Sequence, residues 1–267
     1  MSKQASESQQ YWDKLASEAA VVGAKTLNIE KNWLAIYADE RVGSLLLETV
    51  NRYRKEAKAY LLDIGCGPGK WINLLVKRFT HVTGVGIDLS TEMLKQAKKR
   101  ISRGNVNLAG MNVAKLGFPS ELFHLVTSVT VLQHILDDET WRNAIKEMVR
   151  VTKPKGHIII YEIASPVWQF KVRKLSEYVS QFEMVGARLI HWRGADPSYP
   201  ATMLGLLQYG RSFNPEEVYN FDKKHAKLLS QLSMILATLA RIIDFHTGKT
   251  IFGLLAPHKI MVYEKIS

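Results

Sequence analysis

Cysteine is nearly absent from this chain, because Cys66 is its only one in 267 residues. A single cysteine cannot form a disulfide within the chain, and it cannot supply a cysteine-rich metal site. The sequence also shows no group of metal-ligating residues at a recognisable spacing. We therefore expect neither an internal disulfide nor a bound metal ion.

Long apolar runs are missing as well. No segment approaches the ~20 consecutive apolar residues that a helix needs to cross a bilayer. The N-terminus begins Met-Ser-Lys-Gln, without the apolar core of a secretory signal. We therefore expect a cytoplasmic protein without a transmembrane segment. The 46% of hydrophobic residues suffices to bury one sizeable core.

Acidic residues are outnumbered, since 25 aspartates and glutamates stand against 36 lysines and arginines, for a net charge of +11. Basic runs attract phosphate groups through a salt-sensitive electrostatic term, although most such runs form only a solvated face. The sequence contains no recognisable RNA-binding module. Nucleic acid is therefore an alternative partner that the charge alone suggests.

The glycines that are present gather after an apolar strand. Residues 60–70 read Tyr-Leu-Leu-Asp-Ile-Gly-Cys-Gly-Pro-Gly-Lys, which predicts a strand, a tight turn and the start of a helix, with a backbone that can approach a ligand closely. The P-loop pattern G-x-x-x-x-G-K-[ST] does not occur. The dinucleotide pattern G-x-G-x-x-G/A also fails, because the sixth position counted from Gly65 is Lys70.

Asp63 distinguishes the two cofactor classes by its charge. It lies just before the first glycine of the loop, at the end of the predicted strand. A carboxylate there repels a pyrophosphate, but it attracts the cationic methionine end of S-adenosylmethionine (SAM). The spacing and the charge of the loop therefore favour SAM.

Residues 63–69, Asp-Ile-Gly-Cys-Gly-Pro-Gly, resemble motif I of the class I SAM-dependent methyltransferases. Segments 82–88, 111–116, 123–129 and 151–162 are similar to the later motifs of that family, in the same order. The resemblance implies an enzyme that uses SAM and releases S-adenosylhomocysteine. Within motif I, it implies cofactor contacts from Asp63, Gly65, Cys66 and Gly67.

Later positions are expected at the adenosine part of the cofactor. Asp88 ends an apolar strand about 20 residues past the glycine loop, where a ribose-binding carboxylate belongs. The resemblance places Leu89 and Met93 against the adenine. Asn112 stands where the family usually has an acid, but its side-chain carbonyl can still accept a hydrogen bond from the adenine amino group. The Val113 backbone amide would donate to a ring nitrogen.

The N-terminal residues 11–16, Tyr-Trp-Asp-Lys-Leu-Ala, resemble the leader helix that folds over bound SAM in many relatives. This resemblance makes Trp12 a candidate cofactor contact. The alternative is a surface helix that two aromatic residues anchor.

Strand-length apolar runs alternate with helical stretches such as 92–101 and 139–151, which is typical of βαβ units. We expect a single α/β domain with a Rossmann-like, mostly parallel sheet and helices on both faces. Residues 1–45 would form a helical cap, and residues 46–194 with 251–267 the core. Residues 195–250 would be a helical insertion before the last strand, as a lid, a dimer interface or a membrane contact.

Two residues are candidates for the general base that a hydroxyl acceptor needs. His134 follows the fourth predicted strand, at the face where the acceptor must lie, and its alternative role is to cap the next helix. Glu162 closes the fifth strand, where an acid can face the cleft.

The expected function is methyl transfer from SAM to a small-molecule acceptor. The leading case is O-methylation of a sugar, lipid or secondary metabolite, with the inserted segment governing the choice of acceptor. The alternatives are methylation of RNA or protein, and a SAM-binding partner subunit without catalytic activity. A homodimer would form through the insertion.

Overall fold

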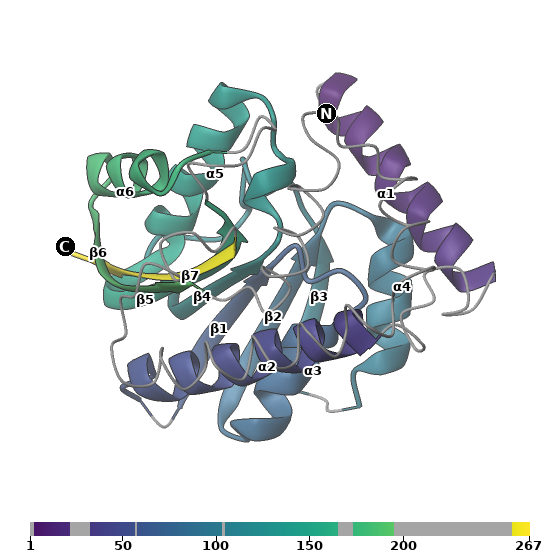
Figure 1. Cartoon of the computed structure of the whole chain (residues 1–267), viewed down its shortest axis with the longest axis horizontal. Coiled ribbons are helices and arrows are strands. Elements are labelled where there is room, and N and C mark those ends of the chain that lie inside the picture. Colours follow the sequence, from purple (N-terminus) through teal and green to yellow (C-terminus); the bar gives the residue numbers. More distant parts are fainter. Residues whose placement is uncertain (1–2, 22–32, 57, 103–104, 165–172, 195–257) are drawn as a thin grey trace, which may run out of the picture.

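The computed structural model describes residues 3–21, 33–56, 58–102, 105–164, 173–194 and 258–267 (Figure 1). The predicted insertion at 195–250 therefore lies outside the described residues, and so does residue range 251–257. None of the described helices is both long enough and apolar enough to cross a membrane.

The described strands form one sheet in the order β3-β2-β1-β4-β5-β7-β6. Strands β1 to β5 pair in parallel, whereas β7 runs antiparallel to both β5 and β6. This sheet confirms the expected Rossmann-like α/β class. The strands are β1 Ala59–Ile64, β2 Val82–Asp88, β3 Val106–Gly110, β4 Phe123–Val129, β5 Thr152–Ile163, β6 Ala187–Gly194 and β7 His258–Lys265.

Six α-helices are described along the chain, and the short 3-10 helix η2, Leu132–His134, follows β4. Figure 1 shows α1 alongside α4, and the sheet between α2 and α3 on one side and α5 and α6 on the other. The helices are α1 Lys3–Val21, α2 Trp33–Tyr53, α3 Lys70–Arg78, α4 Thr91–Arg100, α5 Asp138–Val151 and α6 Leu175–Met184.

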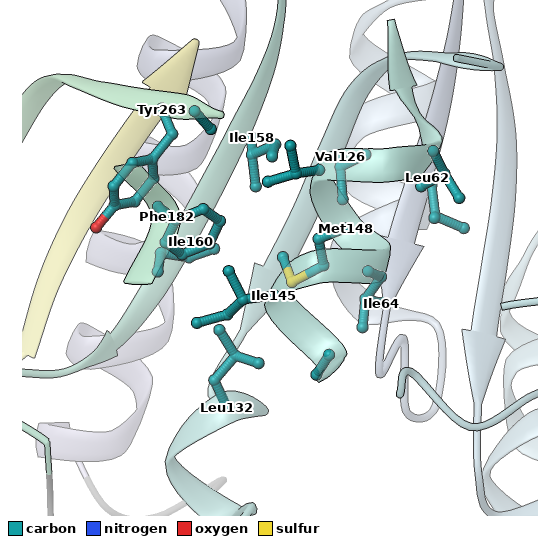
Figure 2. Packing of buried hydrophobic residues seen from close by; sticks show 14 of the residues in the cluster. Leu62, Ile64, Val126, Leu132, Ile145, Met148, Ile158, Ile160, Phe182 and Tyr263 are labelled. Atoms are coloured by element: carbon teal, nitrogen blue, oxygen red, sulfur yellow. The ribbon is translucent and has the colours of Figure 1, made fainter. Parts of the chain in front are cut away.

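Helices cover both faces of the sheet, and successive residues of a strand point to opposite faces. Both sets of side chains are therefore buried. Leu61 and Leu125 are partners in the β1–β4 register, and they pack with α2 and α3. Their neighbours Leu62 and Val126 pack with α5 and α6 on the other face. Figure 2 shows this second cluster, where Met148 of α5 lies among the strand residues.

The element bounds agree closely with the sequence. The strand predicted at 82–88 is β2, and the helices predicted at 92–101 and 139–151 are α4 and α5. Helix α4 begins and ends one residue earlier than predicted, and α5 begins one residue earlier. The last two strands are antiparallel neighbours, as a hairpin-like arrangement requires.

The order of the strands reverses between β1 and β4. Helices that leave these two neighbouring strands cover opposite faces of the sheet, so a crevice opens at the carboxyl ends of the strands. Ligands of open α/β sheets bind in this crevice. The fold thus places the glycine loop after β1 and the turn after β4 at the expected ligand site.

Candidate functional site

A pocket of about 920 Å³ lies at the carboxyl ends of the parallel strands. Its size is within the range of small-molecule and cofactor sites. Of the residues predicted to form the site, Asp63 and Glu162 are not part of its wall. The predicted residues that line it are Trp12, Gly65, Cys66, Gly67, Asp88, Leu89, Met93, Asn112, Val113 and His134.

The glycine loop needs its glycines for two physical reasons. Gly65 has φ of 61°, and a Cβ there would lie 2.3 Å from Cγ2 of Val131, which follows β4. Gly67 has φ of 52°, but a Cβ there would meet nothing within 4 Å. The first glycine therefore allows the loop after β1 to pack closely against the turn after β4. The second faces open space and lets the backbone border the pocket.

Asp88 ties the glycine loop to the start of α4. Its Oδ2 accepts the backbone N–H of Gly67 at 2.8 Å, and its Oδ1 accepts the backbone N–H of Ser90 at 2.8 Å. Burial raises the pKa of this carboxyl. Each carboxylate oxygen can accept more than one hydrogen bond, so a ligand hydroxyl can still bind. We propose that Asp88 holds the ribose of SAM.

Asp63 lies deeper, beneath the loop. Its Oδ1 accepts a hydrogen bond from the Thr127 hydroxyl at 2.7 Å, while the buried Oδ2 has no hydrogen-bond partner in the described part of the chain. Burial raises the pKa of Asp63 to about 7. A buried carboxylate oxygen without a partner favours a nearby donor or cation. The residues present therefore fit a cofactor with a cationic end.

The loop after β3 borders the proposed adenine side. The side-chain oxygen of Asn112 accepts the backbone N–H of Ala114 at 2.9 Å, which shapes the loop. The backbone N–H of Met111 donates to the Asp88 carbonyl at 3.0 Å, so the loop is also held against β2. Asn112 and Val113 both line the pocket. Their hydrogen bonds to adenine stay a prediction.

Helix α1 is attached to the start of α4 by hydrogen bonds. Oδ1 of Asp13 accepts the Ser90 hydroxyl at 2.5 Å and the Glu92 backbone N–H at 3.1 Å. The Gln96 side chain donates to the Ala16 carbonyl at 2.9 Å. These bonds bring Trp12 of α1 to the pocket wall. The described part of α1 is therefore docked on the core beside the predicted cofactor site.

His134 is the last residue of η2 and lines the pocket. Its ring centroid lies 5.1 Å from that of Trp12, with the two planes at 81°. Burial lowers the pKa of His134, which favours the neutral ring at pH 7. The alternative role as a helix cap is wrong, because Asp137 caps α5 and accepts the Thr140 backbone N–H at 2.7 Å.

Glu162 does not fit its predicted role as a base. It is buried at the end of β5, and its carboxylate does not line the pocket. Both of its oxygens accept backbone N–H groups from residues 131–133 at 2.9 to 3.1 Å. These donors lie in the turn that carries His134. The carboxylate therefore points to the protein backbone.

Sequence reasoning missed several parts of the site. Asp13 follows Trp12 directly, yet nothing in the sequence links it to Ser90, which lies on a distant segment. Thr127 gave no signal either, because a threonine within an apolar strand is common. The pocket wall also includes Lys70, Trp71, Thr130 and Tyr161, which adjoin the predicted motifs. No group of three or more residues in the described ranges could hold a metal ion.

Comparison with known proteins identifies the segment that carries the glycine loop. Residues 61–156 match the family described as "Methyltransferase domain". A demethylmenaquinone methyltransferase of Geobacillus kaustophilus is 33% identical over 127 residues, which cover 46% of this chain and 53% of that protein. The ubiquinone/menaquinone biosynthesis C-methyltransferase UbiE of Pseudomonas fluorescens is 30% identical over 139 residues, covering 49% and 52%. The chain thus spans about half the length of the curated relatives it matches.

A solved structure shares the fold over a longer part of the chain. Phosphoethanolamine N-methyltransferase 2 of Haemonchus contortus, in complex with SAM, superposes with a TM-score of 0.54 at 18% sequence identity. The match covers 87% of this chain and 57% of that one. At this identity, the likeness shows the common fold alone.

Replacing Asp88 by alanine tests the proposed ribose site. The change removes a charged acceptor, and such hydrogen bonds contribute about 1.5–3 kcal/mol, so we expect SAM to bind roughly tenfold to a hundredfold more weakly. Calorimetric titration measures the affinity, and circular dichroism checks that the variant is folded. An unchanged affinity in a folded variant would remove Asp88 from the ribose site.

Replacing Asp13 by alanine tests the docking of α1. Loss of the two hydrogen bonds from Ser90 and Glu92 should loosen the helix and weaken SAM binding by roughly tenfold. Glu7→Ala, at an exposed position of the same helix, is the matched control and should bind SAM as the unmodified chain does. Equal affinities for the two variants would show that the docked helix does not contribute to cofactor binding.

Three observations agree on the identity of the core. The segment 61–156 matches a methyltransferase domain, the sheet has the order 3-2-1-4-5-7-6 with β7 antiparallel, and the pocket lies at the glycine loop. Residues 61–156 therefore belong to a class I SAM-dependent methyltransferase domain, a family whose cofactor is S-adenosylmethionine.

Proposed function

We propose that this chain transfers the methyl group of SAM to a small-molecule acceptor that bears an ionisable hydroxyl group, with His134 as the base. The observation that carries the proposal is the position of His134, which lines the pocket beside Trp12 and lies on the turn after β4. This turn contacts the glycine loop through Val131 and Gly65. The base and the cofactor loop therefore border the same cavity.

SAM supplies a methyl carbon bonded to a positively charged sulfur. A nucleophile can attack this carbon in line with the sulfur, which leaves as a neutral thioether. The protein contributes chiefly by aligning the reacting groups and excluding water. The glycine loop and Asp88 would hold the cofactor on one side of the pocket. Trp12 of the docked helix would cover it and reduce the access of water.

The neutral imidazole of His134 can accept a proton from an acceptor hydroxyl. Burial lowers the pKa of His134 below the usual 6.5, and this keeps a nitrogen lone pair available at pH 7. Removing the proton from the hydroxyl makes the acceptor more nucleophilic. Such a step suits an aromatic hydroxyl, which is more acidic than an alcohol.

Deprotonation of an aromatic hydroxyl activates the oxygen and also the ring carbons ortho and para to it. Transfer to oxygen was the leading expectation from the sequence. The name of the Pseudomonas fluorescens relative states C-methyltransferase activity for that protein, which supports a ring carbon as the accepting atom here. Both products begin with the same proton transfer to His134. Transfer to a ring carbon is completed when that carbon loses its hydrogen as a proton and the oxygen is protonated again.

The proposal is tested by incubating the protein with ¹³C-methyl-labelled SAM and a panel of hydroxylated aromatic, sugar and lipid acceptors. A labelled product with an aromatic hydroxyl acceptor is expected. The ¹³C spectrum separates a methoxy carbon from a ring methyl carbon and so identifies the accepting atom. Transfer only to amines, RNA or protein would contradict the proposal. A homodimer through 195–250 stays a prediction.

Replacing His134 by glutamine should lower kcat by roughly 10² to 10⁴, the usual contribution of a general base, and leave SAM affinity nearly unchanged. His81→Gln is the matched control, because His81 is exposed just before β2, at the opposite edge of the sheet from the pocket. Turnover by the His134 variant at the rate of the control would show that His134 is not the base.

A further inference from the structure

Glu162 is an ionisable side chain that the proposed chemistry leaves without a task. It is 0% exposed, although charged residues are seldom fully buried unless they are paired. Burying a carboxylate is costly unless hydrogen bonds compensate for the lost water. Such a residue at the end of a strand beside the pocket therefore calls for a physical explanation.

The compensation comes from three successive backbone amides. Oε1 accepts the N–H groups of Val131 at 2.9 Å and Leu132 at 3.0 Å, and Oε2 accepts the N–H of Gln133 at 3.1 Å. Hydrogen bonds to an ionised acceptor are stronger than those between neutral groups. The backbone of the turn after β4 is thus bound directly to the side chain that ends β5.

A side chain of the same turn adds a connection in the opposite direction. Oε1 of Gln133 accepts the backbone N–H of Ile163, the residue after Glu162, at 3.0 Å. The next residue in the turn is His134, whose N–H donates to the Val131 carbonyl at 3.0 Å. The backbone immediately before His134 is therefore held from both sides by the end of β5.

We propose that Glu162 is a positioning residue that fixes the turn 131–134 and thereby sets the place of the His134 ring in the pocket. This inference rests on the proposed function, in which His134 is the base. Catalysis depends on the placement of the reacting groups, and a displacement of about 1 Å can cost roughly a hundredfold in rate. A carboxylate bound to three amides restricts such displacement.

Charged and titratable groups from other elements surround Glu162. His258 and Lys259 belong to β7, where Lys259 is the register partner of Glu162. Tyr178 faces it from α6, and Arg173 precedes that helix. Burial raises the pKa of Glu162 to about 7 despite its hydrogen bonds. Above that pH the ionised carboxylate binds all three amides, and below it the added proton weakens this binding.

Glu162→Gln is the sharpest test, because it keeps the size of the side chain. The amide oxygen can still accept from Val131 and Leu132, but the amide nitrogen would face the N–H of Gln133, and two donors repel each other. We expect kcat to fall by roughly tenfold to a hundredfold, with SAM affinity unchanged. Glu177→Gln is the matched control, because Glu177 of α6 accepts the backbone N–H of Lys174, the residue before the helix, and does not line the pocket.

The pH profile separates positioning from a general effect on folding. In the unmodified protein, kcat should fall as the pH drops through about 7, where Glu162 gains its proton. The Glu162→Gln variant should lack this dependence and lose activity only at the lower pH where His134 becomes protonated. A control-like kcat, or a profile that keeps the step near pH 7, would overturn the proposal.

Two structural measurements keep the inference distinct from the proposed function. Amide hydrogen exchange at residues 131–133 should become faster in Glu162→Gln but not in Glu177→Gln, and the NMR signal of the His134 ring should shift. If the His134→Gln variant keeps full turnover, the proposed base is wrong. If amide exchange and the His134 signal are both unchanged in Glu162→Gln, the positioning role of Glu162 is wrong. If Glu162→Gln does not fold, Gln133→Ala replaces it, with a smaller loss of kcat expected in the same direction.

Discussion

The loops around the pocket are held by carboxylates that lie at or near the carboxyl ends of the strands and accept backbone N–H groups. Asp88 binds the amides of Gly67 and Ser90, and Glu162 binds the turn after β4. Backbone N–H groups in loops beyond the ends of the strands have no partner in the sheet, so they need another acceptor when they are buried. These carboxylates supply it, and they fix the loops that would contact the cofactor and the acceptor.

Asp13, Asp63 and Asp88 are neighbouring carboxylates on the cofactor side of the pocket, within a chain of net charge +11. The charge of Asp88 raises the pKa of Asp63, and the charge of Asp13 raises the pKa of Asp88, although burial is the largest cause in both cases. A positive ligand placed among these groups would relieve their mutual repulsion and favour their ionised forms. These carboxylates thus match a cationic cofactor by charge.

The sequence predicted most of the fold and the cofactor side of the pocket, because those features depend on local patterns. The apolar run before Asp63, the alternate glycines and the acid at position 88 each have a spacing that specifies a strand, a turn or a strand end. Asp13 and Glu162 could not be assigned in this way. An acid at the end of a strand can face a ligand or a backbone turn, and only the three-dimensional position of residues 131–133 decides between them.

Binding of SAM in the pocket is best measured by calorimetric titration of the purified protein with SAM, S-adenosylhomocysteine and NADH. We expect saturable binding of the first two ligands and no binding of NADH, because the glycine loop lacks the dinucleotide spacing and Asp63 would repel a pyrophosphate. Binding of NADH in preference to SAM, or no binding of SAM at all, would contradict it.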